Sequence, residues 1–225
     1  PAAKRILQEM VEETPDYLPA LFTLAEIAAN EKKFDESADL VAKILARDSA
    51  YPEAVLLSSR LKLQAGKTAK AVTELEGMVK AYPQSAQAQY QLAAAYVADH
   101  QLDKANASLA QALALQPDYT EAIVLQAGLN INSGNFGAAI AALKPVVEKN
   151  PRVLQPWLLL ADAYRKQGNF DEALAVFDQV EKHFPKQPQT PLSKGFLYLQ
   201  QNKKTEAREA FLQTRALSTR YPPAE

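Results

Sequence analysis

The sequence predicts an all-α fold, an α-solenoid of stacked antiparallel helix pairs, and three observations carry this prediction. The chain repeats with a fixed period of 34 residues, small residues recur in register at that period, and each period holds two stretches of apolar residues at helical spacing. Prolines mark the period, because Pro83, Pro117, Pro151 and Pro185 are 34 residues apart and Pro15 lies two periods before Pro83. A fixed period of this length is typical of repeat proteins.

Small residues form two columns at this period, with no insertion between them. The first column is Ala25, Ser59, Ala93, Ala127, Ala161 and Gly195. The second column is Ala3, Ser37, Ala71, Ala105, Ala139, Ala173 and Ala207. An apolar column accompanies them: Leu7, Val41, Leu75, Leu109, Leu143, Phe177 and Phe211. Small side chains let two helices approach closely, and stacking is needed because one helix pair cannot bury its apolar stripe alone.

The two helices of a period are clearest in the fifth one. Trp157, Leu160 and Tyr164 recur at helical spacing, and a second apolar stripe starts at Phe170. Each helix is expected to have about 12–14 residues and a length of roughly 20 Å. Between the two helices lies a turn position at which glycine adopts a left-handed conformation at low cost. The residues at that position are Lys32, Gly66, His100, Gly134, Gly168 and Asn202.

Composition excludes several classes of function. Of the 225 residues, 48% are apolar and 23% are charged, which is typical of a folded protein and not of a disordered one. The net charge of −1 lacks the basic excess of a nucleic-acid-binding domain, and no apolar run is long enough to span a membrane. Cysteine is absent and only two histidines are present. We therefore expect no metal, no cofactor and no catalytic residues.

The fifth period carries a recognisable series of residues: Trp157, Leu160, Ala161, Tyr164, Gly168, Ala173, Phe177 and Pro185. In this series the chain resembles the tetratricopeptide repeat family. The resemblance covers residues 1–225 as one solenoid and implies a partial repeat, 1–16, followed by six full repeats: 18–51, 52–85, 86–119, 120–153, 154–187 and 188–221. It also implies a right-handed superhelix whose concave face is formed by the first helices and receives a peptide or a partner helix.

Two repeats depart from the pattern of the family. The second has Ser58 and Lys62 where leucine and tyrosine are usual, and the sixth has Lys194 and Lys204 at places that are usually apolar. Polar residues at core positions weaken a repeat unless they find partners. We expect these two repeats to be less stable than the others.

The resemblance places three columns of residues on the concave face. The central column is Phe22, Leu56, Tyr90, Val124, Leu158 and Leu192. One helical turn on are Glu26, Arg60, Ala94, Gly128, Asp162 and Phe196. The next column is Ala29, Leu63, Val97, Ile131, Arg165 and Leu199. A subgroup of the family binds acidic chaperone tails with lysine, asparagine and arginine on this face, but apolar residues occupy those places here.

We therefore expect an apolar or amphipathic protein segment as the partner. Tyr90, Val124 and Leu158 would be the central anchors, flanked by Val97, Ile131 and Asp162, and Arg165 would orient a partner carboxylate. The alternative is that the apolar columns only pack between neighbouring first helices.

The repeat spacing and the composition of the chain predict its wider role. The spacing and the alanine- and glutamine-rich composition resemble repeat proteins of the bacterial cell envelope, including lipoproteins that accompany exopolysaccharide export in PEP-CTERM systems. The resemblance implies a periplasmic or envelope scaffold, and the alternative is a regulatory arm of a larger enzyme such as a transferase. Ile6 and Phe211 lie in helices that lack a neighbour, and Tyr221 reads as the entry to another repeat. We expect a piece of a longer array whose ends associate with each other.

Overall fold

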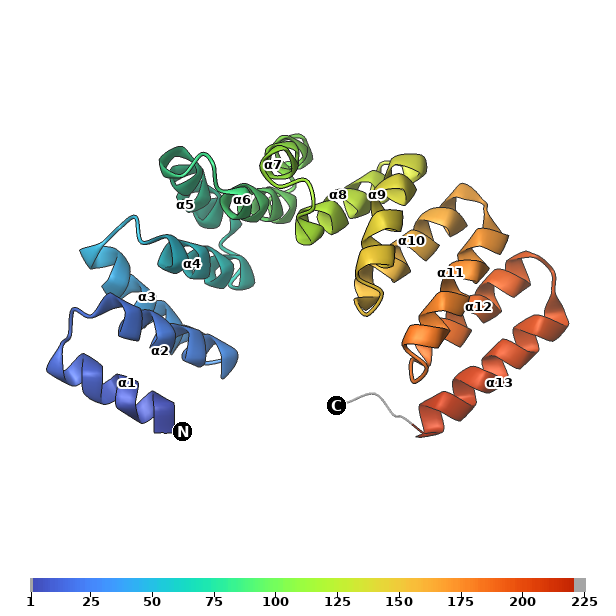
Figure 1. Ribbon diagram of the computed structural model, residues 1–225, viewed down its shortest axis with the longest axis horizontal. Helices are drawn as coiled ribbons and strands as arrows, with labels where there is room; N and C mark the ends of the chain where they lie inside the picture. Colours follow the sequence, from blue (N-terminus) through green and yellow to red (C-terminus); the bar gives the residue numbers. More distant parts are fainter. Residues whose placement is uncertain (1, 221–225) are drawn as a thin grey trace. The chain divides into compact units, whose positions relative to one another are not determined.

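The computed structural model describes residues 2–220, and within that range the chain is built of α-helices joined by short turns (Figure 1). The chain divides into two compact units, Pro1–Tyr119 and Thr120–Glu225. The division falls at the end of the predicted repeat 86–119. Tyr221, the last residue of the predicted sixth repeat, lies outside the described residues.

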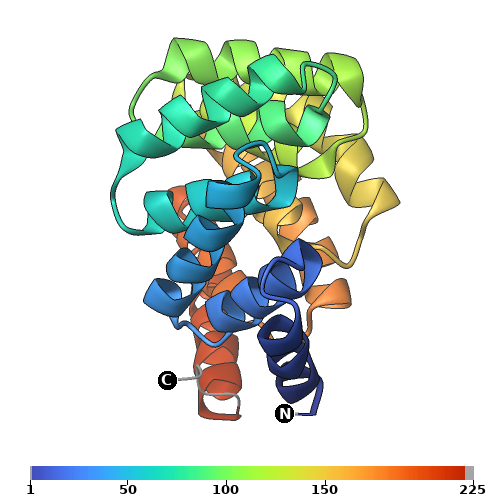
Figure 2. The ribbon, with the colours of Figure 1, turned by 90° about the vertical axis from the view of Figure 1, so that its left-hand side faces the viewer.

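Unit 1 contains seven helices in its described part: α1 (Ala2–Glu13), α2 (Leu18–Asn30), α3 (Phe34–Arg47), α4 (Pro52–Gln64), α5 (Thr68–Ala81), α6 (Ala86–Ala98) and α7 (Leu102–Leu115). Consecutive helices pack side by side, and Figure 2, in which this unit faces the viewer, shows the same order from α1 to α5. Each predicted repeat of the unit holds one helix pair: α2 with α3, α4 with α5, and α6 with α7. The all-α prediction is confirmed here.

Unit 2 contains six helices in its described part: α8 (Thr120–Asn132), α9 (Phe136–Lys149), α10 (Leu154–Gln167), α11 (Phe170–His183), α12 (Gln189–Gln200) and α13 (Lys204–Arg220). They form the pairs α8 with α9, α10 with α11, and α12 with α13, and neighbouring pairs pack through α9 with α10 and α11 with α12. The expected helix length holds except in α13, which has 17 residues. The two units are thus made of the same repeated element.

The turn between the two helices of a pair has one backbone conformation throughout. Its φ angle is positive at all six predicted positions, from 71° to 87° at the three glycines and close to 60° at the other three residues. The left-handed region costs a side chain about 1 kcal/mol or more, which glycine avoids. The turn is therefore a constraint of the repeat, and Lys32, His100 and Asn202 adopt it without glycine.

The small columns are the closest points of the packing. Ala25, Ala93, Ala127 and Ala161 are all fully buried, and so are the alanines of the second column from Ala71 to Ala173. Gly195 completes the first column for a steric reason, because a Cβ atom there would lie 2.4 Å from the ring of Phe211. These residues of both columns therefore lie in the core, at the close contacts between helices.

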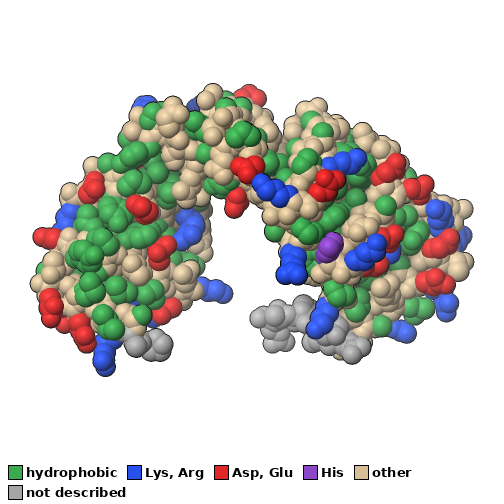
Figure 3. Space-filling view, viewed as in Figure 1, with side chains coloured by type: hydrophobic (Ala, Val, Ile, Leu, Met, Phe, Trp, Pro, Cys, Tyr) green, Lys and Arg blue, Asp and Glu red, His purple; other side chains and the backbone are tan. Residues whose placement is uncertain are grey.

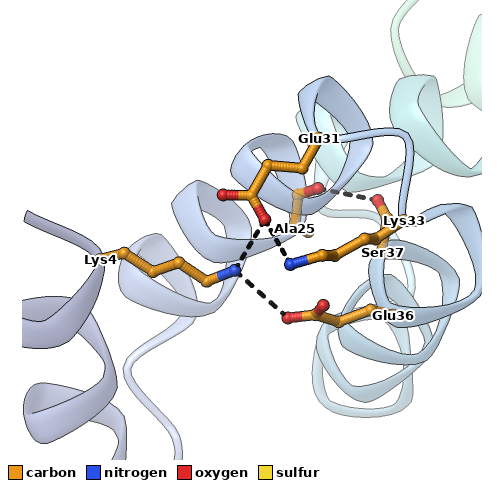
Figure 4. Close-up of polar contacts among 6 residues, drawn as sticks. All are labelled: Lys4, Ala25, Glu31, Lys33, Glu36 and Ser37. Atoms are coloured by element: carbon orange, nitrogen blue, oxygen red, sulfur yellow. Dashed lines mark hydrogen bonds and ion pairs between the residues drawn. The ribbon is translucent and has the colours of Figure 1, made fainter. Parts of the chain in front are cut away.

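Serine replaces alanine in these columns where a hydroxyl finds a nearby backbone acceptor. The Oγ of Ser37 donates to the carbonyl oxygen of Ala25 at 2.8 Å (Figure 4). Beside it, Glu31 accepts from the Nζ atoms of Lys33 at 2.7 Å and of Lys4 at 3.1 Å. These hydrogen bonds, from Lys33 first and then Lys4, lower the pKa of Glu31. Lys4 thus links helix α1 to the pair α2–α3.

The polar residues of the two divergent repeats are paired with carboxylates of a second helix. Lys194 in α12 lies 2.8 Å from an oxygen of Asp178 and 2.9 Å from one of Glu181, both in α11. Burial lowers the pKa of Lys194, but the hydrogen bonds and charges of the two carboxylates outweigh burial and raise it. Lys204 only begins α13 and is exposed. The partly buried lysine of the sixth repeat is thus compensated by two carboxylates.

Candidate partner-binding surface

We call the surface formed by the first helices of the pairs the first-helix face. It comprises α2, α4 and α6 in unit 1, and α8, α10 and α12 in unit 2. In unit 1, α4 contacts both α2 and α6, and in unit 2, α8 contacts α10. The second helices pack mainly against the first helices of their own and the next pair. Because the first helices approach one another, they lie on the inner side of each stack.

The predicted central column lies on this face, and all of its members are partly buried. Its residues are Phe22, Leu56, Tyr90, Val124, Leu158 and Leu192. Val124 and Leu158 also pack against the main apolar cluster of unit 2. Each residue therefore gives part of its surface to the packing between helices and leaves the rest accessible.

Two aromatic pairs shape the face in unit 1. The ring of Phe22 lies 6.0 Å from that of Tyr51, and the ring of Tyr90 lies 5.2 Å from that of Tyr119 in an edge-to-face arrangement. Burial, followed by the charges of Glu53 and Asp48, raises the pKa of Tyr51. These contacts hold Phe22 and Tyr90 in place, as expected of preorganised aromatic anchors. Val97, on the same helix as Tyr90, is also partly exposed.

A groove with a volume of about 430 Å³ opens on the face in unit 2, between α10 and α12. Its walls are formed by Leu158, Ala161, Asp162, Arg165, Phe177, Gln189, Ser193, Phe196 and Gln200. Phe196 is 57% exposed, the most exposed large apolar side chain in the described part of the chain. Its ring meets that of Phe211 edge to face at 5.5 Å, so its position is fixed on one side.

Charges at this groove are already paired with each other. Asp162 lies 2.5 Å from a guanidinium nitrogen of Arg165 and 3.5 Å from the Nζ of Lys166, all on α10. The side chains are one-third or more exposed, so the pairs contribute little to stability. Arg165 keeps further N–H donors beyond the one directed at Asp162. A partner carboxylate would have to compete with Asp162 for this arginine.

The structure separates the predicted site residues into four groups. Leu158, Asp162 and Arg165 line the groove of unit 2, and Leu192 lies near it on α12 without lining it. Phe22, Leu56, Tyr90 and Val97 belong to the face of unit 1. Val124 lies on α8 of unit 2 and is not part of the groove lining. Ile131 is 3% exposed and part of the core, because α8 turns it towards the second helices. We leave it out of the surface.

Sequence reasoning passed over Phe196 as a site residue. The residue stands in the second column, where the other five members are charged or small. A single large apolar side chain in an otherwise polar or small column is a signal for an exposed anchor, and it was available in the sequence.

Residues 2–220 hold neither a cluster of metal ligands nor a membrane-spanning helix. In that range no three histidine, aspartate or glutamate side chains are grouped so that they would hold a metal ion. No described helix is both long and apolar enough to cross a membrane.

The architecture is that of a helical-repeat solenoid built from antiparallel pairs. The sequence profile of the tetratricopeptide repeat matches residues 28–95, 62–129, 96–163 and 130–190, which together cover well over half of the chain. The chain belongs to the tetratricopeptide repeat family. Proteins of this family generally serve as scaffolds that bind protein partners, and this chain has the fold of such a protein-interaction scaffold. No curated protein sequence matches it.

Solved structures show the same fold at low sequence identity. A tetratricopeptide repeat protein from Parabacteroides merdae aligns with a TM-score of 0.71 and 18% identity, over 95% of this chain and 85% of the other. MamA from Desulfovibrio magneticus aligns with a TM-score of 0.67 and 18% identity, over 73% of this chain and 93% of the other. A chain of the anaphase-promoting complex assembly Cut9–Hcn1 aligns with a TM-score of 0.78 and 16% identity, over 97% of this chain but only 43% of that chain.

Proposed function

We propose that the first-helix face binds an apolar or amphipathic segment of a protein partner, and that the groove between α10 and α12 is its main contact. The observation that supports this most is the exposed ring of Phe196 beside Leu158 in a groove of about 430 Å³. A ring that is 57% exposed and held by Phe211 gains apolar burial on binding without being reordered. Aromatic side chains of this kind are frequent hot spots in interfaces.

Charged residues at the groove would set the orientation of the bound segment. The Asp162–Arg165 pair lies at the wall, so an acidic residue of the partner would take Arg165 and leave Lys166 to pair with Asp162. Exchanging one exposed pair for another changes the affinity little but disfavours the reversed orientation. Tyr90 and Leu56 in unit 1 would add a second contact area for the same or another segment.

The test uses peptides selected from a random 16-residue phage library panned on the chain and then measured by fluorescence anisotropy. Leu158→Asp or Phe196→Ser should weaken the selected peptides by at least tenfold. Leu102→Ser is the matched control, because Leu102 is 49% exposed on α7 and lies outside this face. Equal affinity for the parent and for both groove variants, with unchanged melting, would contradict the proposal. Tyr90→Ala tests the area in unit 1 separately.

We also propose that the scaffold works in bacterial cell-envelope assembly, on the basis of its resemblance to envelope repeat proteins. Fractionation of the native organism with an antibody to this chain would test the compartment, and cytoplasmic recovery would contradict it. The alternative is a repeat arm that regulates a larger enzyme. The sequence of the complete gene separates the two roles, since a catalytic domain next to the array would favour the second.

Self-association of the ends is a further part of the proposed function. A shallow groove of about 430 Å³ on α12 and α13 is lined by Leu199, Phe211 and Leu212 among others, and Leu199 and Leu212 are 48% and 40% exposed. In α1, Ile6 and Met10 are exposed as well. Sedimentation velocity at increasing concentration should show association that Leu212→Glu reduces, and a monomer at millimolar concentration would contradict it.

A further inference from the structure

The second-helix side of unit 1 carries a groove that the first-helix face does not account for. It lies between α3 and the start of α5, above the C-terminal half of α4, and has a volume of about 600 Å³. The residues around it are Phe34, Asp35, Ala38, Val41, Ala42, Leu45, Ala46, Ser58, Leu61, Lys62, Ala65, Lys67 and Lys70. On the left of Figure 3, hydrophobic side chains gather over the region in which Figure 1 draws α3 to α5.

The third and fifth repeats show what fills this space when a leucine and a tyrosine stand at these two positions. Tyr96 on α6 spans the two neighbouring second helices: its hydroxyl donates to Glu76 on α5 at 2.6 Å, and Lys104 on α7 lies 5.3 Å from the centre of its ring. In unit 2, the Nζ of Lys144 on α9 lies over the ring of Tyr164, 5.8 Å from the centre of the ring. Both tyrosines are less than 10% exposed, as are Leu92 and Leu160 one turn before them.

The second repeat has Ser58 and Lys62 at these two positions. The Nζ of Lys62 turns to Glu74 on α5 at 2.8 Å, and the hydroxyl of Ser58 donates to the same carboxylate at 3.0 Å. Both polar side chains are therefore directed to Glu74 on α5. The groove is the volume that a leucine and a tyrosine side chain occupy elsewhere in the same molecule.

The interior of the groove is apolar and the mouth is basic. Val41, Leu45 and Leu61 line the interior, and Phe34 remains 36% exposed at one end. Lys67 and Lys70 lie at the mouth, and no ion pair to either occurs within residues 2–220. Asp35 is the one acidic residue of the lining, so the positive charge is in excess even with Lys62 paired to Glu74.

From this arrangement we infer that the groove binds an amphipathic α-helix of a protein partner, which inserts large apolar side chains between α3 and α5 and places acidic residues against Lys67 and Lys70. Three features favour a helix over a lipid chain. The missing volume has the shape of two side chains one helical turn apart. The lining of α3 runs from Phe34 to Ala46, about 18 Å at 1.5 Å per residue, which matches about three turns of a second helix.

The third feature is the exposed surface of α3 itself. Ala38, Ala42 and Ala46 are exposed and lie one turn apart, so a helix can approach closely over Leu45. Apolar burial supplies the affinity, and the two lysines supply the preference for acidic flanks and the salt dependence. This site is independent of the groove between α10 and α12.

The experiment pans a phage library of 16-residue peptides on the chain after counter-selection on a variant whose groove is filled. Ser58→Leu with Lys62→Tyr restores the residues of the third repeat and closes the groove. Ala42→Trp closes it while leaving the Ser58–Glu74–Lys62 contacts in place, so that one blocked variant folds even if the other does not. We expect enriched peptides with apolar residues at helical spacing and acidic flanks, which bind the parent at least tenfold more tightly than either blocked variant.

Charge variants sharpen the result. Lys67→Glu with Lys70→Glu should weaken the enriched peptides fivefold or more, whereas Lys80→Glu with Lys182→Glu, an equal change in net charge away from the groove, should not. Methyl resonances of Val41, Leu45 and Leu61 should shift on binding. Failure to enrich any peptide, or equal binding by parent and blocked variants, would overturn the inference. Shifts of the same methyl groups with dodecanoate but with no peptide would overturn it in favour of a lipid.

Discussion

The contact between the first and second full repeats differs from the contact between the fourth and fifth, although equivalent positions of the repeat form both. In unit 2, Leu160 and Tyr164 bury themselves between α9 and α11 and join the largest apolar cluster of the unit. In unit 1, Ser58 and Lys62 occupy the same positions, bind Glu74 and leave α3 and α5 separated by a groove. The period and the helices are unchanged between them.

The difference shows that a helical repeat tolerates loss of its larger core residues when the small columns are kept. The small column is buried in both regions, at Ala25 and Ser59 in unit 1 and at Ala161 in unit 2. These small residues set the distance between the helices. The leucine and tyrosine positions add apolar burial, about 1.5–3 kcal/mol for a side chain of that size. Replacing them exchanges stability for an accessible surface, which is a common relation between stability and function.

The largest expected loss of stability is in unit 2, where large apolar side chains fill the space between the helices. Trp157→Ala should destabilise unit 2 by about 3–5 kcal/mol, because it removes a large buried side chain from the core. Trp157 is 8% exposed, its ring stacks on that of His183 at 5.9 Å, and its Nε1 donates to the carbonyl oxygen of Pro151 at 3.1 Å. Urea denaturation by circular dichroism measures the loss, with hydrogen exchange of α10 and α11 to place it. Parent-like melting would mean that this region is not the core of its repeat.

An intermediate loss of stability is expected in unit 1, beside the groove between α3 and α5. Glu74→Gln should cost about 1–2 kcal/mol, because charge-assisted bonds from Ser58, Ser59 and Lys62 converge on this carboxylate. The loss is limited because the side chain of Lys62 is 31% exposed and solvent screens its charge. In a Lys62→Met background the same change should cost less, and a double-mutant cycle measures the coupling. Strict additivity would show that Lys62 does not stabilise the second repeat.

The helix pairs could be predicted from the sequence alone, because the fold requires small residues at the same positions of every repeat. The small columns are read directly, since a larger side chain at Ala161 would push two helices apart. Even the turn conformation followed from three glycines, and the positive φ of Lys32, His100 and Asn202 agrees with their place in the period.

The candidate sites were less predictable, because exposure depends on how a whole stack packs. Ile131 shares its column with Val97, yet α8 buries it while Val97 stays partly exposed. The period identified Ser58 and Lys62 as departures from the repeat, but their common partner Glu74 belongs to another helix. A polar residue at a core position can leave the space around it filled or open. Lys194 packs against Asp178 and Glu181, whereas a groove remains at Lys62. Side chains outside the repeat pattern decide between the two outcomes.

The smallest effect concerns the tyrosine that fills the position of Lys62 in the third repeat. Tyr96 is 6% exposed, and its hydroxyl donates to Glu76. Burial, then the hydrogen bond with Glu76 and its charge, raise the pKa of Tyr96 to about 12. Tyr96→Phe should cost about 1 kcal/mol at neutral pH, the net value of one hydrogen bond.

The pH dependence of that loss tests its cause. In the unfolded chain a tyrosine titrates near pH 10, so the folded state holds the phenol proton more tightly. The resulting stability is fully present below pH 10 and is lost as the pH rises through about 12. The difference in unfolding free energy between the parent and Tyr96→Phe should therefore shrink across this range, while titrations common to both proteins cancel. Tyr82→Phe, which removes a bond to the carbonyl oxygen of Ala50 from a ring that is 38% exposed, is the control. A difference that stays constant to pH 12 would show that folding does not raise the pKa of Tyr96. Equal stability of the parent and Tyr96→Phe at neutral pH would show that the hydroxyl adds nothing to the packing of the ring, and the contrast with Lys62 would then rest on volume and not on hydrogen bonding.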